Sequence, residues 1–301
     1  MAARIPVILD TDIGSDIDDA VALAYLLSEP ACELLGVTTV TGDVEKRSRL
    51  AGYIADVAGR GDLPIRSGLS EVMLFGPGQP EVPQYEAIEK LPHRKDFAKD
   101  AVVFLRDTIR SRPGEIVLLT IGPLTNIGAL FTADPEIPSM LKALVMMCGV
   151  FTAGGQFGPG RREWNALVDP VATAITYRAR PKQFASVGLE VTTRCTMDAG
   201  EVRRKFTEAG PLMRSVLNLA EVWFRSRPRL CFHDPLASVY VFDPDVLKMC
   251  KGTVTVETTS RELGGLTSFQ PAKDDEPAPH DVAVNVDVER FFAKYFKTVV
   301  Q

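Results

Sequence analysis

The stretch that decides the fold spans residues 5–20 and reads IPVILDTDIGSDIDDA. Its first part, Ile5 to Leu9, is a short apolar run typical of a buried β-strand. From Ala20 to Leu27 the apolar residues have helical spacing, and Pro30 predicts the end of that helix. The acidic loop Asp10–Asp19 joins the two. We therefore interpret this stretch as the opening of a βαβ unit.

The rest of the chain repeats this alternation of short apolar runs and helix-period segments. It predicts an α/β fold with an open, mainly parallel sheet flanked by helices. Residues 59–95 are rich in Gly and Pro and are expected to form a long loop. The absence of internal repeats and linkers predicts a single domain over 1–301. We expect strands at 34–40, 116–121, 143–147, 184–189, 253–257 and 282–288, with helices at 45–58, 97–110 and 170–177, two more between 199 and 225, and one at the end.

Composition excludes several classes of protein. The chain has 301 residues, of which 46% are hydrophobic and 24% charged, as expected of an ordinary globular protein. A net charge of −5 without a long basic run makes nucleic acid and anionic membranes poor partners. No apolar run is long enough to span a membrane, and no secretory signal is visible. Five scattered cysteines argue against a disulfide framework, so we expect a cytoplasmic location.

The acidic loop carries the main chemical information. Five of its ten residues are aspartates, and they lie in the connection between the expected first strand and the expected first helix. Two carboxylates about 5 Å apart repel by roughly 3 kcal/mol at an effective dielectric constant near 20, unless a cation or raised pKa values relieve them. Helix capping accounts for one or two aspartates but hardly for five. Hard oxygen ligands without nearby Cys or His favour Ca²⁺ or Mg²⁺ over zinc.

Other acidic and phosphate-binding patterns fit less well. The spacing from Asp10 places Val21 where an EF-hand needs its bidentate Glu, and no phosphate-binding glycine loop occurs. An apolar strand followed by Asp10-Thr11-Asp12 is similar to the D-x-D signature of haloacid-dehalogenase-type phosphohydrolases. A metal-dependent phosphohydrolase and a non-catalytic Ca²⁺- or ligand-binding protein therefore stay open as alternatives.

Four segments together resemble the inosine–uridine nucleoside hydrolase family. The first is Asp10–Ala20, with its D-T-D and D-D-A elements around a glycine-containing loop. The others follow in the family's order and are Ile121–Asn126, Glu163-Trp164-Asn165 with Asp169-Pro170, and His233-Asp234-Pro235. The resemblance implies a Ca²⁺-dependent enzyme that hydrolyses the N-glycosidic bond of ribonucleosides to free base and ribose.

The resemblance also implies a role for each matching residue. Asp12 is expected to bind Ca²⁺ and to deprotonate the attacking water, and His233 to assist the departure of the base. Calcium ligands are expected to be Asp12, Asp19, the carbonyl of Ile121, and Asp234. Residues expected to contact the nucleoside are Asp18, Asn165, Glu163 and Met147. Glu163 near the 5′-hydroxyl would repel a phosphate, which favours nucleosides over nucleotides. The family also implies a homodimer or homotetramer.

Some of these residues also have a purely structural interpretation. Asp-Pro occurs four times, at Asp134, Asp169, Asp234 and Asp243, and is a common helix start. Thr125-Asn126 is interpreted as a helix cap only. Two departures from the family pattern are included among the candidate substrate-contacting residues: Asp43, which stands where the family has Asn, and Gln156, which aligns with a 5′-hydroxyl ligand.

Overall fold

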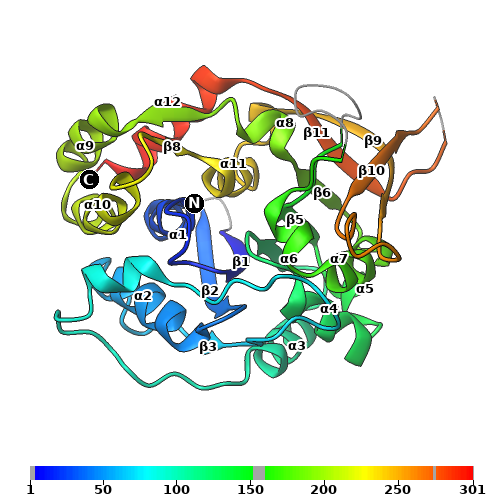
Figure 1. The fold of residues 1–301 in the computed structure, drawn as a ribbon, viewed down its shortest axis with the longest axis horizontal. Helices are drawn as coiled ribbons and strands as arrows, with labels where there is room; N and C mark the ends of the chain where they lie inside the picture. The colour runs from blue at the N-terminus through cyan, green and yellow to red at the C-terminus, as the bar shows by residue number, and fades with distance from the viewer. Residues whose placement is uncertain (1–3, 152–159, 274–275, 301) are drawn as a thin grey trace.

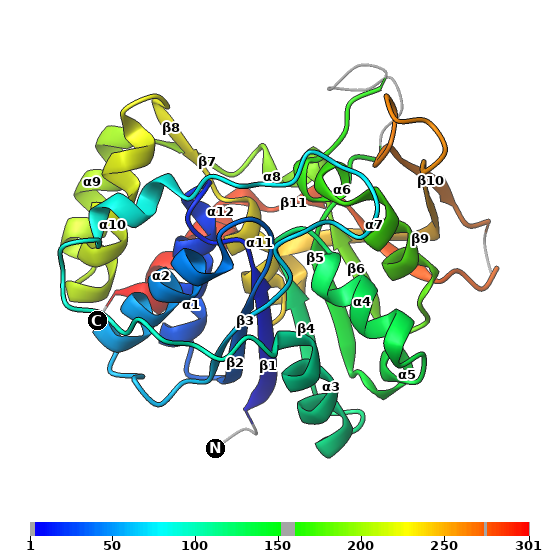
Figure 2. The ribbon, with the colours of Figure 1, turned by 60° about the horizontal axis from the view of Figure 1, so that its bottom comes forward.

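A computed structural model describes residues 4–151, 160–273 and 276–300. Its centre is a nine-stranded sheet with strand order β10-β9-β11-β6-β5-β4-β1-β2-β3. Figure 1 looks onto one edge of this sheet, and Figure 2 shows it with helices on both sides. The strands of this sheet are β1 (Ile5–Thr11), β2 (Cys32–Thr39), β3 (Ile65–Ser67), β4 (Val117–Thr120), β5 (Ala143–Met147), β6 (Phe184–Val187), β9 (Leu247–Val256), β10 (Thr267–Pro271) and β11 (His280–Val286).

The sheet is mainly parallel, as the sequence predicts. All pairings from β3 through β11 are parallel, whereas β9 is antiparallel to both β11 and β10. Chain order reverses at β1, because β2 lies on one side of it and β4 on the other. Ligands in open α/β sheets bind beyond the carboxyl ends of the strands at such a reversal. The acidic loop follows β1 directly, so the topology places it at that position.

The hydrophobic core lies on both faces of the sheet, and strand β1 is buried on each of these faces. Val7 and Leu9 point into one apolar cluster and Ile8 into the other. The first cluster lies under α1 (Asp18–Ser28), α2 (Val44–Val57), α10 (Pro211–Phe224), α11 (His233–Tyr240) and α12 (Val288–Val299). The second lies under α3 (Ala101–Ser111), α4 (Thr125–Ala133), α5 (Ile137–Met140) and α7 (Pro170–Arg178). These two helical layers flank the sheet in Figure 2.

The C-terminal helix α12 packs against α1, the helix that follows the acidic loop. The Tyr295 hydroxyl donates to the carbonyl of Val21 at 3.0 Å, and the ring of Tyr295 stacks on Tyr25 with centroids 5.6 Å apart. Lys294 forms a 2.6 Å ion pair with Glu29, whose side chain is almost fully buried. The C-terminal helix therefore packs along the helix that begins at the acidic loop.

The structure corrects the sequence-based elements mainly where they are short. Residues 59–95 are not only loop, since they contain edge strand β3 and the 3₁₀ helix Pro83–Ala87. Strand β9 begins at Leu247, six residues before the expected start at Thr253. A separate hairpin of β7 (Thr196–Asp198) and β8 (Arg229–Cys231), and the short helices α6 (Trp164–Val168), α8 (Leu189–Thr192) and 244–246, were not predicted. Segments of three to five residues are too short to show a period. The two helices expected between 199 and 225 are confirmed as α9 (Ala199–Glu208) and α10, which begins at Pro211.

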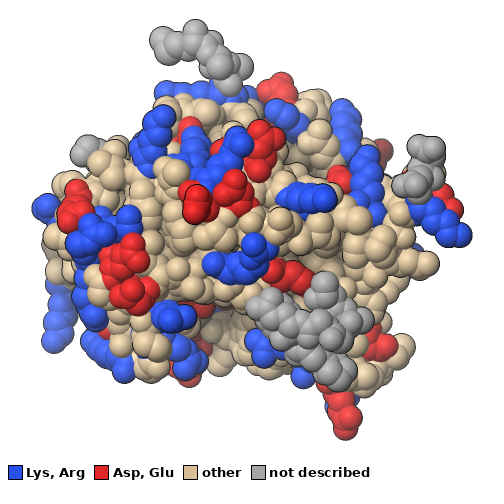
Figure 3. Space-filling view, turned by 90° about the horizontal axis from the view of Figure 1, so that it is seen from above, with Lys and Arg blue, Asp and Glu red and all other residues tan. Residues whose placement is uncertain are grey.

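Surface charge follows the near balance of the composition. Figure 3 shows Lys and Arg interspersed with Asp and Glu over the face that it presents. Within the described part of the chain, none of the helices has the length and apolar character needed to cross a membrane.

Candidate active site

The acidic loop is held in a tight turn beyond the end of β1. Gly14 has φ +115°, and a Cβ atom there would meet Val82 at 2.5 Å and Leu50 at 2.6 Å, so only glycine fits. The segment around residue 82 also fastens the loop directly. Backbone N–H of Gln84 donates to Gly14 at 3.1 Å, and the Ser15 hydroxyl donates to the carbonyl of Glu81 at 2.9 Å.

Three buried carboxylates converge at this turn. Asp18 and Asp19 are the first two residues of α1, and Asp234 is in the first turn of α11, which packs alongside α1. One oxygen from each lies within 4.8 Å of the other two. The backbone N–H of Asp234 donates to Asp18 at 3.0 Å, and the Thr11 hydroxyl donates to Asp19. The set offers hard, closely spaced oxygen ligands, which is the donor chemistry that Ca²⁺ and Mg²⁺ require.

Among the described residues, none of these three carboxylates forms an ion pair, although the Arg47 guanidinium lowers the pKa of Asp19 somewhat. Burial raises the pKa values of Asp18, Asp19 and Asp234 well above the ordinary range, and repulsion from neighbouring aspartates raises them further. The same two causes raise the pKa of Asp16 to about 6. Burial also raises the pKa of Asp12, and the nearby Arg47 guanidinium opposes that rise. A divalent cation would relieve the repulsion that raises these values.

A buried arginine supports the loop from behind. The side chain of Arg47, in α2, has no exposed surface. Its Nε donates to the carbonyl of Thr41 at 2.8 Å, and its Nη2 donates to the carbonyl of Gln79 at 2.8 Å. Its Nη1 donates to the carbonyl of Asp12 and, at 3.0 Å, to the Ser15 hydroxyl. One guanidinium thus ties the acidic loop to the end of β2 and to the loop before the 3₁₀ helix.

The end of β4 comes close to Asp12. The N–H of Ile121 donates to the carbonyl of Asp10 at 2.9 Å. A Cβ atom on Gly122 would meet the backbone nitrogen of Asp12 at 2.7 Å, so this approach requires glycine. Asn165 then joins two strand ends, since its Nδ2 donates to the carbonyl of Ile121 at 2.9 Å and to that of Met147 at 3.0 Å.

The Glu163 carboxylate is buried but well supplied with donors. It is the N-cap of α6 and accepts from the N–H groups of Asn165 at 2.7 Å, Ala166 at 3.0 Å and Gly149 at 3.1 Å. Burial raises its pKa, and these N–H groups oppose the rise. Part of its position is therefore explained by capping.

His233 lies next to Asp234 at the start of α11. Its Nδ1 is 2.7 Å from the hydroxyl of Thr192 and 3.7 Å from the Cys231 sulfur. Burial lowers the pKa of the imidazole to about 4, so the ring is neutral at physiological pH.

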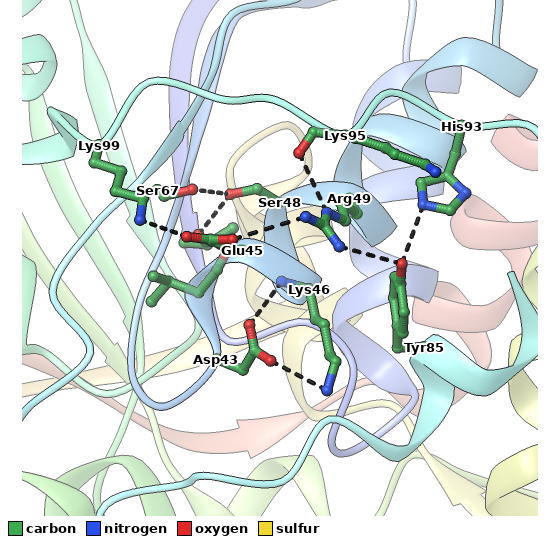
Figure 4. Close-up of polar contacts among 12 residues, drawn as sticks. Asp43, Glu45, Lys46, Ser48, Arg49, Ser67, Tyr85, His93, Lys95 and Lys99 are labelled. Atoms are coloured by element: carbon green, nitrogen blue, oxygen red, sulfur yellow. Dashed lines mark hydrogen bonds and ion pairs between the residues drawn. The ribbon is translucent and has the colours of Figure 1, made fainter. Parts of the chain in front are cut away.

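One predicted contact is not brought to this group. The carboxylate of Asp43 is the N-cap of α2, accepting from the N–H of Lys46 at 3.0 Å and pairing with its Nζ at 3.2 Å. Figure 4 shows Asp43 directed at Lys46, among the other polar contacts of α2. A capping position at the start of a helix accounts for the residue without a site role. Gln156 lies outside the described residues.

The aspartates of the other three Asp-Pro pairs have structural roles. Asp169 caps α7 and accepts from the Thr125 hydroxyl at 2.8 Å, while Asp134 and Asp243 form ion pairs with arginines. The expected capping role of Thr125-Asn126 is wrong, because the N-cap of α4 is Leu124; Asn126 instead donates to Asp10 at 2.7 Å and accepts from the N–H of Leu69 at 2.9 Å.

Sequence reasoning missed Arg47 and Thr192. Arg47 falls among the buried positions of α2, between Val44 and Ala51. A charged residue on an apolar helical stripe was the available signal. Thr192 had no such signal, because its contact with His233 spans 41 residues.

An open α/β sheet whose carboxyl edge presents a group of buried carboxylates is typical of enzymes that work with a bound cation. Comparison with known proteins agrees with this class. The sequence pattern of the family described as "Inosine-uridine preferring nucleoside hydrolase" matches residues 7–293. The chain belongs to this family, and it is therefore a hydrolase that acts on N-glycosyl bonds.

Individual relatives cover almost the whole chain. The non-specific ribonucleoside hydrolase RihC of Salmonella typhimurium is 31% identical, over 97% of this chain and 96% of its own. Uridine nucleosidase 1 of Arabidopsis thaliana is 29% identical, over 94% of this chain and 89% of its own. The solved structure of a purine-preferring ribonucleoside hydrolase from Gardnerella vaginalis superposes with a TM-score of 0.83 at 25% identity, covering 98% of each chain. The predicted family and fold class are confirmed.

Proposed function

We propose that this chain hydrolyses ribonucleosides to free base and ribose with Ca²⁺ bound at the acidic loop, and that Asp12 is the base. The observation that carries the proposal is the convergence of buried carboxylates, which form no ion pair among the described residues, at the reversal point of the sheet. Asp12, Asp19, Asp234 and the carbonyl of Ile121 would hold the cation. When bound, the cation would orient the ribose hydroxyls and lower the pKa of the attacking water.

The other residues of the site have separate roles in the proposed reaction. Asp12, a carboxylate directly after β1, removes a proton from the attacking water. Asp18 and Asn165 bind the ribose 2′- and 3′-hydroxyls, and Met147 lies beneath the sugar. The surrounding negative charge stabilises the positive charge that develops on the ribose ring as the C1′–N bond breaks. His233 lies beside the leaving base.

The family and the site favour nucleosides over phosphorylated substrates. Glu163, which the family resemblance assigns to the 5′-hydroxyl, would repel a phosphate group. We do not carry the phosphohydrolase alternative further, because the family match covers residues 7–293. Asp43 and Gln156 are left as candidate modifiers of substrate preference, Asp43 with less support because it caps α2.

The first test is release of reducing sugar from a panel of purine and pyrimidine ribonucleosides at saturating Ca²⁺. Asp12→Ala should lower kcat by at least about 1,000-fold, because the water then loses its base. Asp62→Ala, at an exposed aspartate paired with Arg60, is the matched control and should keep full activity. If the wild type cleaves no nucleoside while Ca²⁺ still binds, the proposed function is wrong.

Three further expectations belong to this proposal. Residues 1–301 form a single domain, supported by one sheet that takes strands from residue 5 to residue 286. The protein works in the cytoplasm, where the free thiols of its cysteines would persist. It forms a homodimer or homotetramer, which light scattering coupled to size-exclusion chromatography would measure.

A further inference from the structure

The two ring nitrogens of His233 have different surroundings. Nδ1 lies 2.7 Å from the hydroxyl oxygen of Thr192. Nε2 has no hydrogen-bond partner among the described residues, and the side chain is only partly buried. One nitrogen is thus held from the interior, while the other is left for a ligand.

The surroundings of Thr192 determine which atom donates. Thr192 ends α8 and has no exposed surface. The neighbouring Thr193 donates its hydroxyl to the carbonyl of Leu189, four residues earlier, at 2.7 Å. The Thr192 hydroxyl makes no such bond, and His233 Nδ1 is the partner it has in the described structure. A buried hydroxyl without an acceptor destabilises the fold, because it loses its hydrogen bond to water and gains none. Thr192 therefore donates to Nδ1.

A hydrogen bond in this direction fixes the tautomer of the ring. Nδ1 accepts and so carries no proton, which puts the single proton of the neutral imidazole on Nε2. The Cys231 sulfur, 3.7 Å from the same nitrogen, donates instead to the carbonyl of Thr192 at 3.2 Å. The free edge of the ring therefore presents an N–H donor.

We propose that Thr192 is a positioning residue that holds His233 as an Nε2–H donor toward the leaving base. This inference rests on the proposed function. As the C1′–N bond breaks, its electron pair moves onto the base, and the Nε2–H hydrogen bond stabilises the resulting anion. The proton stays on His233. The base gains its own proton from solvent, to which Asp12 returns the one it took from the attacking water.

The kinetic test separates leaving groups that need a donor from one that does not. Thr192→Val keeps the shape and removes the hydroxyl, while Thr192→Ser keeps the hydroxyl. We expect the valine variant to lower kcat on ribonucleosides about 10-fold to 100-fold with KM little changed, and serine to restore it. On p-nitrophenyl riboside, whose phenolate needs no donor, both variants should match the wild type. An equal loss on both substrates, or no loss on either, would overturn the proposal.

A second measurement does not depend on activity. Nitrogen-15 NMR of ring-labelled histidine reports which nitrogen carries the proton, and the chain has three histidines. His233 should show a protonated Nε2 in the wild type and in Thr192→Ser, and a mixture of tautomers in Thr192→Val. A protonated Nδ1 in the wild type would overturn the inference whether or not any nucleoside is cleaved. If the wild type shows the expected tautomer but cleaves no nucleoside, only the proposed function is contradicted.

Discussion

The molecule contains two buried carboxylate sites with opposite surroundings. At Glu163, three backbone N–H groups point at the two oxygens, so the charge is stabilised by the chain itself. At Asp18, Asp19 and Asp234, the neighbours are mainly other carboxylates, and few donors reach them. Burial raises the pKa at both sites, but mutual repulsion adds to it only in the cluster.

This difference separates a carboxylate that the fold needs from carboxylates that a ligand needs. Replacing Glu163 leaves backbone donors unpaired, whereas replacing a cluster residue removes repulsion in the absence of a cation. Stability and function should therefore respond in opposite ways at the two sites. The following variants test that contrast.

The largest effect is expected for Asp19→Asn. Loss of one charged ligand should weaken Ca²⁺ binding, measured by calorimetry, and lower kcat/KM on the order of 1,000-fold. In chelator-treated protein the same variant should be at least as stable as the wild type, because it removes repulsion. A clear loss of stability without cation would mean that Asp19 serves the fold as Glu163 does. Asp62→Asn is the control.

Arg47→Met should give the largest loss of stability. It leaves several buried carbonyl groups without a donor and removes the positive charge behind the cluster. We expect the unfolding free energy in urea to fall by about 3–5 kcal/mol. Arg49→Met, on the same helix but partly exposed, should cost at most about 1 kcal/mol. Equal losses would show that Arg47 does not anchor the loop.

Glu163→Gln tests the buried carboxylate that is held by backbone N–H groups. A glutamine has one acceptor oxygen, and its NH₂ group would face backbone donors of Ala166 or Gly149. The unfolding free energy should fall by about 1–3 kcal/mol in urea, by the same amount with Ca²⁺ and with chelator. A loss that appears only with Ca²⁺ would place Glu163 in the cation site.

The cluster should also make the metal-free protein sensitive to pH. Burial raises the pKa of Asp10 to about 7 and, with the charge of Asp12, that of Asp16 to about 6. Both lie above the unfolded value of about 3.9. The contribution of these two carboxyl groups to the unfolding free energy is therefore complete below about pH 4, where both are protonated. It is lost as the pH rises through 6 to 7. The melting temperature in chelator should fall between pH 5 and pH 8, and saturating Ca²⁺ should reduce that fall. A flat profile in chelator would contradict the assigned electrostatics.

Asp43→Asn should have the smallest effect. Asparagine caps a helix as well as aspartate does, and the pair with Lys46 is exposed. We expect kcat and the Ca²⁺ affinity to stay at wild-type values and the unfolding free energy to change by less than about 1 kcal/mol. A marked change in kcat would return Asp43 to the active site, against the position that the structure gives it.

Prediction from the sequence succeeded where the information is local. The acidic loop lies between a strand and a helix that each show their period, so Asp12, Asp18 and Asp19 could be placed at a strand end. The position of Asp234 came only from resemblance, because an Asp-Pro pair has the same local pattern whether it caps a helix or joins a cluster.

The remainder depends on contacts between distant segments. Arg47 reaches Gln79, and Thr192 reaches His233, through tertiary packing that no local period records. Strand β3 has three residues and is defined by its pairing with β2. A short strand of this kind is visible only once its neighbour is in place.

The packing of α12 on α1 affects the order in which the protein can mature during translation. The helix that presents Asp18 and Asp19 gains its ring stacking and its ion pair from Tyr295 and Lys294, near the C-terminus. Translation proceeds from the N-terminus, so a nascent chain carries the acidic loop long before these contacts exist. The aspartates made first thus gain their supporting contacts last, and a ribosome-bound chain that ends before α12 should bind Ca²⁺ more weakly than we propose for the finished protein.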